Sequence, residues 1–193
     1  MEKNKLIISG KGILEATKKG TRKYARREIA RPVRTGLLQK LFPKFETIQV
    51  NEIINPGEVV YRVENHNIIC NEGLQLVAGF LIDESAVYDV GLTYCEIGTD
   101  NTAPAAGDVT LTTYHGRKAV TTDSRAAYED TFATFFTAAE STCAIEEAGM
   151  WGGNDAAAGE ATGLLFSHFL VSFDNSGGLY DVTITYVLTV ARG

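Results

Sequence analysis

The sequence predicts an antiparallel β-sandwich with one packed helix and a basic, extended N-terminal arm. Residues 179–190 alternate apolar and polar side chains over a long run, which is typical of a half-buried strand. Residues 71–85 carry apolar side chains at three- and four-residue spacing, which indicates a single helix. Most of the basic residues fall in the first quarter of the chain, and this predicts a segment distinct from the rest.

We interpret residues 1–46 as the arm. Residues 1–44 hold 13 of the 18 Lys and Arg residues but only three acids, for a net charge of +10, whereas the rest of the chain carries −16. Like charges repel, and Gly20, Pro32, Gly36 and Pro43 interrupt regular structure in residues 18–45. Only a short helix over residues 21–30 and a short amphipathic turn over residues 35–42 are therefore expected. We therefore expect the arm to dock on a partner and the body to fold without it. The candidate partner-binding residues are Lys18, Lys19, Arg22, Lys23, Arg26, Arg27, Arg31 and Arg34.

The body, residues 47–193, reads as short strands around the helix. Asn71 is the expected N-cap of this helix, and Leu74, Val77, Ala78 and Leu81 form its expected buried stripe. Seven or so strands at short spacing, without repeated strand-then-helix units, favour a sandwich over a nucleotide-binding α/β fold. The main expected strands are 47–54, 58–63, 91–98, 116–122, 130–138, 143–151, 163–173 and 179–190.

The segment "EIGTDNTAPAAGD", residues 96–108, raises the question of a ligand site. Asp100-Asn101 favours a turn, and Pro104 keeps the following backbone extended. No set of donors or bases converges there by sequence. We interpret the segment as a connector between two strands.

Catalytic and metal-binding patterns are absent from the sequence. Nucleophilic catalysis needs a histidine near a nucleophile, but His66, His115 and His168 lie near no G-x-S-x-G elbow, and His168 falls inside a predicted strand. Neither phosphate-binding glycine motif occurs. We therefore predict no catalytic residue, no cofactor and no enzymatic activity.

The cysteines and acidic loops do not predict a metal site either. Cys70, Cys95 and Cys143 are odd in number and lack C-x-x-C spacing, so we expect three free thiols in a reducing compartment. Asp100, Asp108, Asp155 and Glu160 are oxygen donors without EF-hand spacing, and solvated loops are the expectation. No apolar run approaches the roughly 20 residues that span a bilayer, and no signal peptide is recognisable, so no membrane contact is expected.

The basic arm leaves two kinds of partner open. Its cations can neutralise phosphates of a nucleic acid, but Tyr24 is the only aromatic residue among them, which gives little support for base stacking. The acidic body of another copy offers a ready partner for the same charges. We favour docking on protein and keep nucleic acid as the alternative.

Several motifs of the body resemble a family of virion structural proteins of tailed bacteriophages, usually labelled tail or tail-fibre associated. The motifs are, in order, "NIICNEGLQLVAGFL", "LTYCEIGTDNTAPAAGDVTL", "RKAV", "IEEAGMWGG", "TGLLFSHFLVSF" and "VTITYVLTV". The family pattern has a strand closing in "IGTG-T-AP-GD-AL" and a final alternating strand. This chain departs from it at Asp100, where glycine is usual, and in "LLFSHF". The resemblance covers residues 67–190, so the arm lies outside it.

The resemblance implies a non-enzymatic subunit of a phage tail, baseplate or fibre anchor. Its partners would be copies of itself and other virion proteins, and its location would be the virion, assembled in the host cytoplasm. The alternatives are a capsid decoration or head-to-tail connector protein, or a nucleic-acid-binding protein that uses the arm.

Overall fold

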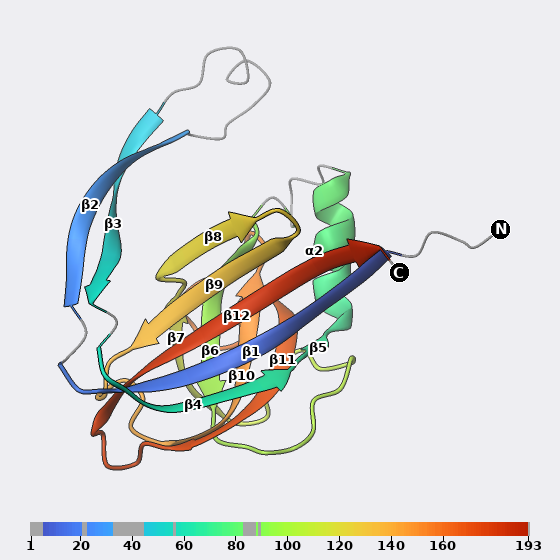
Figure 1. Ribbon diagram of the computed structural model, residues 1–193. Coiled ribbons are helices and arrows are strands. Elements are labelled where there is room, and N and C mark those ends of the chain that lie inside the picture. Colours follow the sequence, from blue (N-terminus) through green and yellow to red (C-terminus); the bar gives the residue numbers. More distant parts are fainter. Residues whose placement is uncertain are drawn as a thin grey trace.

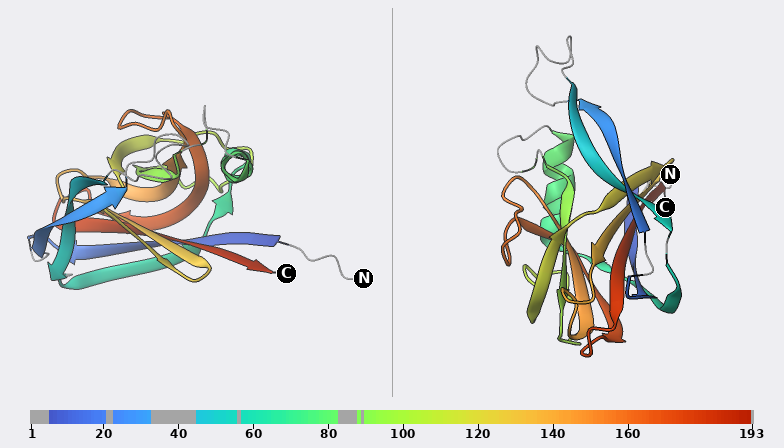
Figure 2. Two further views of the ribbon diagram at one scale, coloured as in Figure 1. Left: turned by 90° about the horizontal axis from the view of Figure 1, so that it is seen from above. Right: turned by 90° about the vertical axis from the view of Figure 1, so that its left-hand side faces the viewer.

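A computed structural model of the chain describes residues 6–20, 23–32, 45–55, 57–82, 88 and 90–192. Within these residues two five-stranded antiparallel sheets stack as two layers, and one helix lies beside them (Figures 1 and 2). This confirms the predicted class, mainly β with antiparallel sheets and one helix. No helix in the described part of the chain is long and apolar enough to cross a membrane.

The front sheet has the strand order β4-β1-β12-β9-β8. Its strands are β1 (Leu6–Lys18), β4 (Val59–His66), β8 (Thr122–Ala126), β9 (Glu129–Phe136) and β12 (Tyr180–Arg192). The back sheet has the order β5-β11-β10-β6-β7. Its strands are β5 (Ile68–Ile69), β6 (Leu92–Gly98), β7 (Tyr114–Ala119), β10 (Ala144–Gly152) and β11 (Leu164–Asp174).

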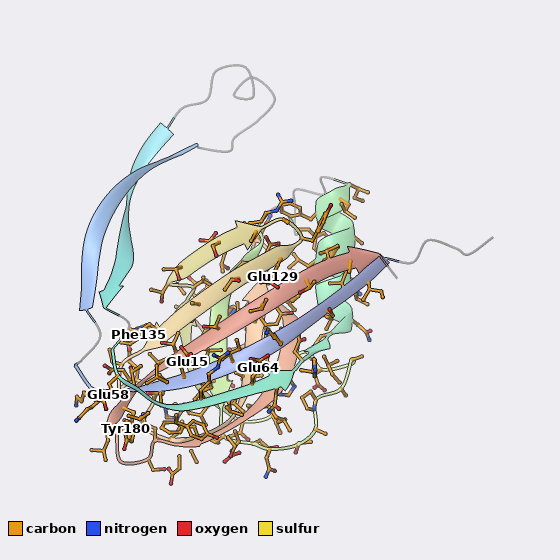
Figure 3. All side chains as sticks on the ribbon, in the orientation of Figure 1. Glu15, Glu58, Glu64, Glu129, Phe135 and Tyr180 are labelled. Carbon is orange, nitrogen blue, oxygen red and sulfur yellow. The ribbon has the colours of Figure 1, made fainter. Side chains whose placement is uncertain are left out.

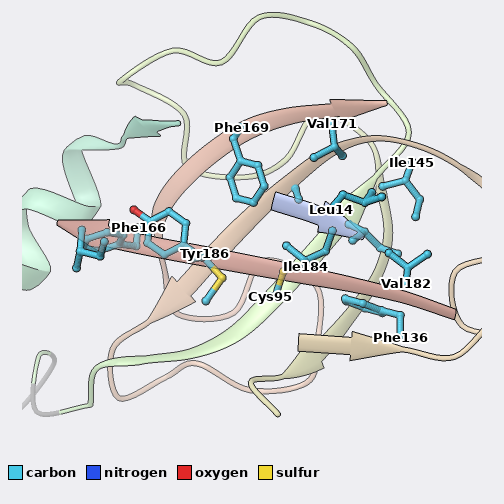
Figure 4. Packing of buried hydrophobic residues seen from close by; sticks show 14 of the residues in the cluster. Leu14, Cys95, Phe136, Ile145, Phe166, Phe169, Val171, Val182, Ile184 and Tyr186 are labelled. Atoms are coloured by element: carbon cyan, nitrogen blue, oxygen red, sulfur yellow. The ribbon is translucent and has the colours of Figure 1, made fainter. Parts of the chain in front are cut away.

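The core lies between the two sheets, and β12 supplies much of it. The alternation predicted for this strand is confirmed, because Val182, Ile184, Tyr186 and Leu188 are all buried in the main apolar cluster. Figure 4 shows Val182, Ile184 and Tyr186 in the same cluster as Phe169 and Val171 of the back sheet. The Tyr186 ring stacks on Phe169 with centroids 6.2 Å apart, and its hydroxyl accepts a hydrogen bond from Asn67.

Strand β1 corrects the predicted division into an arm of residues 1–46 and a body of residues 47–193. It lies in the middle of the front sheet and pairs along its whole length with β12, and over Lys11–Thr17 with β4. Leu14 and Ala16 are fully buried in the core. The charge count missed this strand, because it grouped β1, which holds two lysines and one glutamate, with the more basic residues that follow it. Because β1 supplies a strand and core residues to this sheet, we no longer expect the body to fold without residues 1–44.

Beyond β1 the chain forms a two-stranded antiparallel ribbon of β2 (Lys23–Pro32) and β3 (Phe45–Asn55). The helix expected over residues 21–30 is wrong where the structure describes it, because Lys23–Pro32 is a strand. The ribbon projects from the sandwich at one end (Figure 1). It continues the β1–β4 pair, whose strands meet at its base through the hydrogen bond from Lys18 N to Glu58 O (3.1 Å).

The helix α2 (Asn71–Leu81) confirms the predicted position of the one helix but not its orientation. The residue at the N-cap is Cys70, not Asn71. Gly73, Leu76 and Gly79 face the protein, whereas Leu74 and Leu81 of the expected buried stripe are exposed. The helix approaches β11 so closely that a Cβ at Gly73 would lie 2.3 Å from the carbonyl oxygen of Phe166.

Candidate functional site

The most concentrated polar chemistry in the described residues lies on the side of the back sheet that faces away from the main core. Side chains alternate along a strand, so Cys95 and Ile97 enter the core while Glu96 points to the other side. Glu147 and His168 lie on the neighbouring strands β10 and β11, and both are buried. A small second core of Cys70, Trp151 and Leu165 accompanies them.

Asp108, Glu147 and His168 form a group that we call the histidine cluster. The Nδ1 atom of His168 lies 2.8 Å from Asp108 Oδ2, and its Nε2 atom lies 2.9 Å from Glu147 Oε2. Gly98 of β6 leaves room for this carboxylate, because a Cβ there would lie 2.5 Å from Glu147 Oε1. The imidazole is thus held between two carboxylates in a buried position.

The charge states of the cluster follow from these contacts. Burial alone would lower the pKa of His168, but the hydrogen bonds with Glu147 and Asp108 outweigh it and raise this pKa. Burial alone would raise the pKa of Glu147, but hydrogen bonds from His168 and from the backbone of Thr113 and Thr112 lower it. These shifts favour a protonated His168 beside an ionised Glu147.

This arrangement is suited to stabilising structure. A general base needs a ring nitrogen with a free lone pair within reach of a substrate. Each ring nitrogen of His168 lies within hydrogen-bond distance of a carboxylate oxygen, and only 1% of its side chain is exposed. The arrangement of His168 therefore gives no support to a catalytic role.

The cluster fastens the segment between β6 and β7 to the back sheet. Glu147 accepts hydrogen bonds from Thr112 N (3.0 Å) and Thr113 N (2.7 Å), and Asp108 accepts one from Ala105 N (2.8 Å). Near the helix, Asn71 N donates to Ala106 O. The segment 96–108 connects two strands as predicted, and its last residue also forms part of a buried ion cluster that the sequence did not reveal.

A second buried pair joins Glu96 of β6 to Arg117 of β7. Arg117 Nη1 lies 3.2 Å from Glu96 Oε1, with 0% and 2% of the two side chains exposed. The guanidinium lies over the rings of Trp151 (4.5 Å) and Tyr94 (5.1 Å). Burial raises the pKa of Glu96, although hydrogen bonds from Ala161 N and Arg117 oppose this shift.

This pair holds the loop that follows β10. Arg117 donates to the carbonyl oxygens of Gly159 (3.0 Å) and Thr162 (2.6 Å), while Glu96 accepts from Ala161 N (3.2 Å). Each long loop on the back sheet is therefore anchored by one buried ionic group. Like the histidine cluster, the pair organises backbone and exposes no reactive group.

The cysteines and acidic residues show no sign of reactive or metal-binding chemistry in the described residues. Cys70, Cys95 and Cys143 are buried free thiols, as expected. Burial raises the pKa of Cys70 to about 12 and that of Cys143 to about 11, so both are neutral at physiological pH. No group of three or more His, Cys, Asp or Glu side chains among the described residues is arranged to hold a metal ion.

The structure distributes the predicted partner-binding residues along the base and first strand of the ribbon. Lys18 ends β1, and Lys19 is exposed in the turn after it. Four more lie on β2 and are thereby brought onto one strand, namely Lys23, Arg26, Arg27 and Arg31. Arg22 and Arg34 lie outside the described residues.

Sequence reasoning missed Glu96, Asp108, Arg117 and Glu147 as structural residues. A usable signal was present for two of them, because Glu96 and Glu147 stand inside otherwise apolar strand segments. A buried charge requires a partner, so each predicted a cation or several donors nearby. Asp108 lies in a loop and carried no such signal.

Comparison of this chain with protein-family models, with curated proteins and with solved structures finds no match.

Proposed function

We propose that this chain is a non-enzymatic structural subunit that assembles with copies of itself through its projecting ribbon. The observation that carries this proposal is that β2 and β3 pair only with each other among the described strands. An isolated two-stranded ribbon is at best marginally stable in water. A ribbon of this length is therefore best explained by a partner that covers it.

The charge distribution favours another copy as that partner. Strand β2 carries four basic residues, and residues 45–193 carry a net charge of −16. Glu15, Glu64 and Glu129 lie on the outward side of the front sheet, the side that faces the viewer in Figure 3. Lys11 and Arg62 pair there with Glu64, and Arg62 also with Glu15, so the net acidity of residues 45–193 carries the argument. Opposite charges at such a contact guide the encounter and set its register.

The particular setting, a tailed phage particle, rests on the sequence motifs. In the structure the quoted segments fall on α2, on the back-sheet strands β5, β6 with its following loop, β7, β10 and β11, and on β12 of the front sheet. On this proposal the subunit belongs to a tail, baseplate or fibre anchor, is assembled in the host cytoplasm and contacts other virion proteins. Capsid decoration and head-to-tail connection are the alternative positions.

Removal of the ribbon tests the proposal. Because Lys18 N already bonds to Glu58 O, residues 19–57 can be replaced by Asn-Gly, a two-residue turn that joins paired antiparallel strands. We expect this variant to keep the melting temperature of the sandwich and to sediment as a monomer under conditions in which the full chain assembles. Assembly by the ribbon-less variant equal to that of the full chain would refute the proposal.

A second candidate function is nucleic-acid binding by the ribbon, favoured by the concentration of cations on β2. Replacing Lys23, Arg26, Arg27 and Arg31 by Gln removes these charges and retains the ribbon. If nucleic acid is the partner, binding of a DNA duplex by the full chain falls steeply and log-linearly with salt, and the Gln variant loses it. If protein is the partner, the Gln variant loses self-assembly while the full chain shows no specific DNA binding.

A further inference from the structure

The outward side of α2 is apolar, and we call it the α2 outer face: Leu74, Ala78, Leu81 and Ile82. The exposed fractions are 49% for Leu74, 78% for Leu81 and 73% for Ile82. Phe80 beside them is 47% exposed. Along residues 71–82, all of which the structure describes, the only charged side chain is Glu72, and it accepts a hydrogen bond from Leu165 N.

The packing of the helix explains why these side chains point outward. Gly73 and Gly79 face the protein, and a Cβ at Gly79 would lie 2.1 Å from the ring of Tyr88. The helix thus packs through Gly73, Gly79 and Leu76, and it directs the other large apolar residues Leu74, Leu81 and Ile82 to solvent. Contiguous exposed apolar side chains of this kind mark an interaction surface.

We propose that the α2 outer face binds residues 33–44 of a second copy, the segment that joins β2 to β3. This inference rests on the proposed function and names the contact made by the ribbon. The sequence of the segment, "VRTGLLQKLFPK", supplies a matching set of apolar side chains, Leu37, Leu38, Leu41 and Phe42. It lies outside the described residues, so its chemistry is taken from the sequence alone.

The charges of the two segments also favour residues 33–44 as the partner of the α2 outer face. The segment contains Arg34, Lys40 and Lys44 and no acid. Directly after the α2 outer face the sequence continues with Asp83 and Glu84. An apolar centre flanked by opposite charges on the two sides is the usual composition of a specific interface.

The length of the ribbon favours a second copy over the same chain. Each strand of ten or so residues spans about 33 Å at about 3.3 Å per residue. The far ends of β2 and β3, where Pro32 pairs with Phe45, lie beyond the sandwich and apart from α2 (Figure 1). A contact between two different surfaces of neighbouring copies is heterologous, and repetition of it builds a ring or a helical stack.

Disulfide trapping between two variants tests the contact directly. One variant carries Leu81→Cys and the other Leu38→Cys, and the native cysteines are buried. Mixed and oxidised, they should form a covalent dimer in much higher yield than either variant alone. The matched control replaces Leu81→Cys by Leu179→Cys, a residue 63% exposed on the turn between β11 and β12, and should give only background yield with Leu38→Cys. A yield from the Leu81–Leu38 mixture no greater than this control would overturn the inference.

A chain carrying both substitutions distinguishes the two sources of the segment. If the segment folds back on its own α2, this chain forms an internal disulfide as a monomer, and the inference fails. If the segment comes from a second copy, the doubly substituted chain forms covalent multimers.

Charge insertion separates this inference from the proposed function. Leu81→Glu with Ile82→Glu should weaken self-assembly by at least about tenfold, as expected for loss of central apolar contacts. Leu179→Glu, the matched surface control, should leave it unchanged. If the ribbon-less variant is monomeric but the Glu variant assembles normally, the α2 contact is refuted and the ribbon-mediated assembly stands. If the ribbon-less variant assembles normally, both the proposed ribbon-mediated assembly and the α2 contact are refuted.

Discussion

At the scale of single residues, ionic side chains hold the loops of the back sheet in place. His168 bridges two carboxylates, and one of them, Glu147, also accepts two backbone hydrogen bonds from the segment before β7. Arg117 makes a comparable set of bonds to the loop after β10. Removing one partner of such a buried group leaves an uncompensated charge, which costs about 3–5 kcal/mol.

The histidine cluster predicts how the stability of the protein depends on pH. The folded-state pKa of His168 is raised, so its contribution is complete below its ordinary value of 6.5 and is lost as the pH rises through the folded pKa. The pKa of Glu147 is lowered, so its contribution is present above 4.5 and is lost as the pH falls through the folded pKa. The contribution of the cluster is therefore greatest between these values. Urea unfolding of the wild type and of His168→Gln across this range should show the largest difference near pH 5–6.

Glu146→Gln is the matched control for this experiment, since Glu146 neighbours Glu147 on β10 but is only half-buried. It should not reproduce the difference expected of His168→Gln. A difference between the wild type and His168→Gln that is constant from pH 4 to pH 9 would contradict the ionic account of the cluster.

Residue-scale features were the least predictable from the sequence. His168 was correctly placed in a strand, but its partners lie 21 and 60 residues away in the chain. Local alternation gives the face on which a side chain lies, and it says nothing of which loop covers that face. The positions of Glu96 and Glu147 inside strands could have predicted that each carboxylate has a hydrogen-bonding or ionic partner, but not which residue that partner is.

At the scale of the elements, glycines at inward positions made strand β1 and the inward side of α2 difficult to recognise from the sequence. In β1 the inward positions are Ile8, Gly10, Gly12, Leu14 and Ala16, so two of five carry no side chain and the alternation is faint. In α2 the inward positions include Gly73 and Gly79, and the apolar stripe that the spacing revealed is the outward one. By contrast β12 has an apolar residue at each inward position from Val182 to Leu188, and it was predicted correctly.

Substitution of Gly12 tests whether this glycine is required by packing. A Cβ at Gly12 would lie 2.0 Å from the ring of Phe169, which is fully buried and cannot move freely. We expect Gly12→Ala to lower the free energy of unfolding by about 1–3 kcal/mol, as overpacking of a core does. Chemical denaturation measures this change.

Gly116→Ala in β7 is the control, because the nearest atom to its added Cβ is 3.6 Å away. It should change the free energy of unfolding by less than about 0.5 kcal/mol. Combining Gly12→Ala with Phe169→Leu should cost less than the sum of the two single changes, since the smaller side chain makes room. Equal effects of Gly12→Ala and Gly116→Ala would refute the packing explanation.

At the scale of the whole molecule, the basic N-terminal region divides into two parts with different roles. Strand β1 belongs to the front sheet, and β2 and β3 form a separate two-stranded sheet that projects from the sandwich. The net charge of residues 1–44 does not distinguish β1 from the ribbon, because it contains no information on which residues pair with β12. The boundary between the sandwich and the ribbon falls at the end of β1, where Lys18 N donates a hydrogen bond to Glu58 O.

Two deletions should therefore have opposite consequences for folding. Removing residues 1–18 takes away the only strand that pairs with β4 in the front sheet and leaves the inner edge of β12 unpaired along its length. It also removes Leu14 from the main core. We expect this truncated chain to show no cooperative thermal transition by circular dichroism. The variant in which Asn-Gly replaces residues 19–57 loses more residues, but it should keep a cooperative transition.

A synthetic peptide of residues 1–18 added to the truncated chain should restore a transition, because the missing strand can pair again with β12. A truncated chain that melts cooperatively at the temperature of the full protein would show that β1 is dispensable, and the division of the N-terminal region at Lys18 would then be wrong.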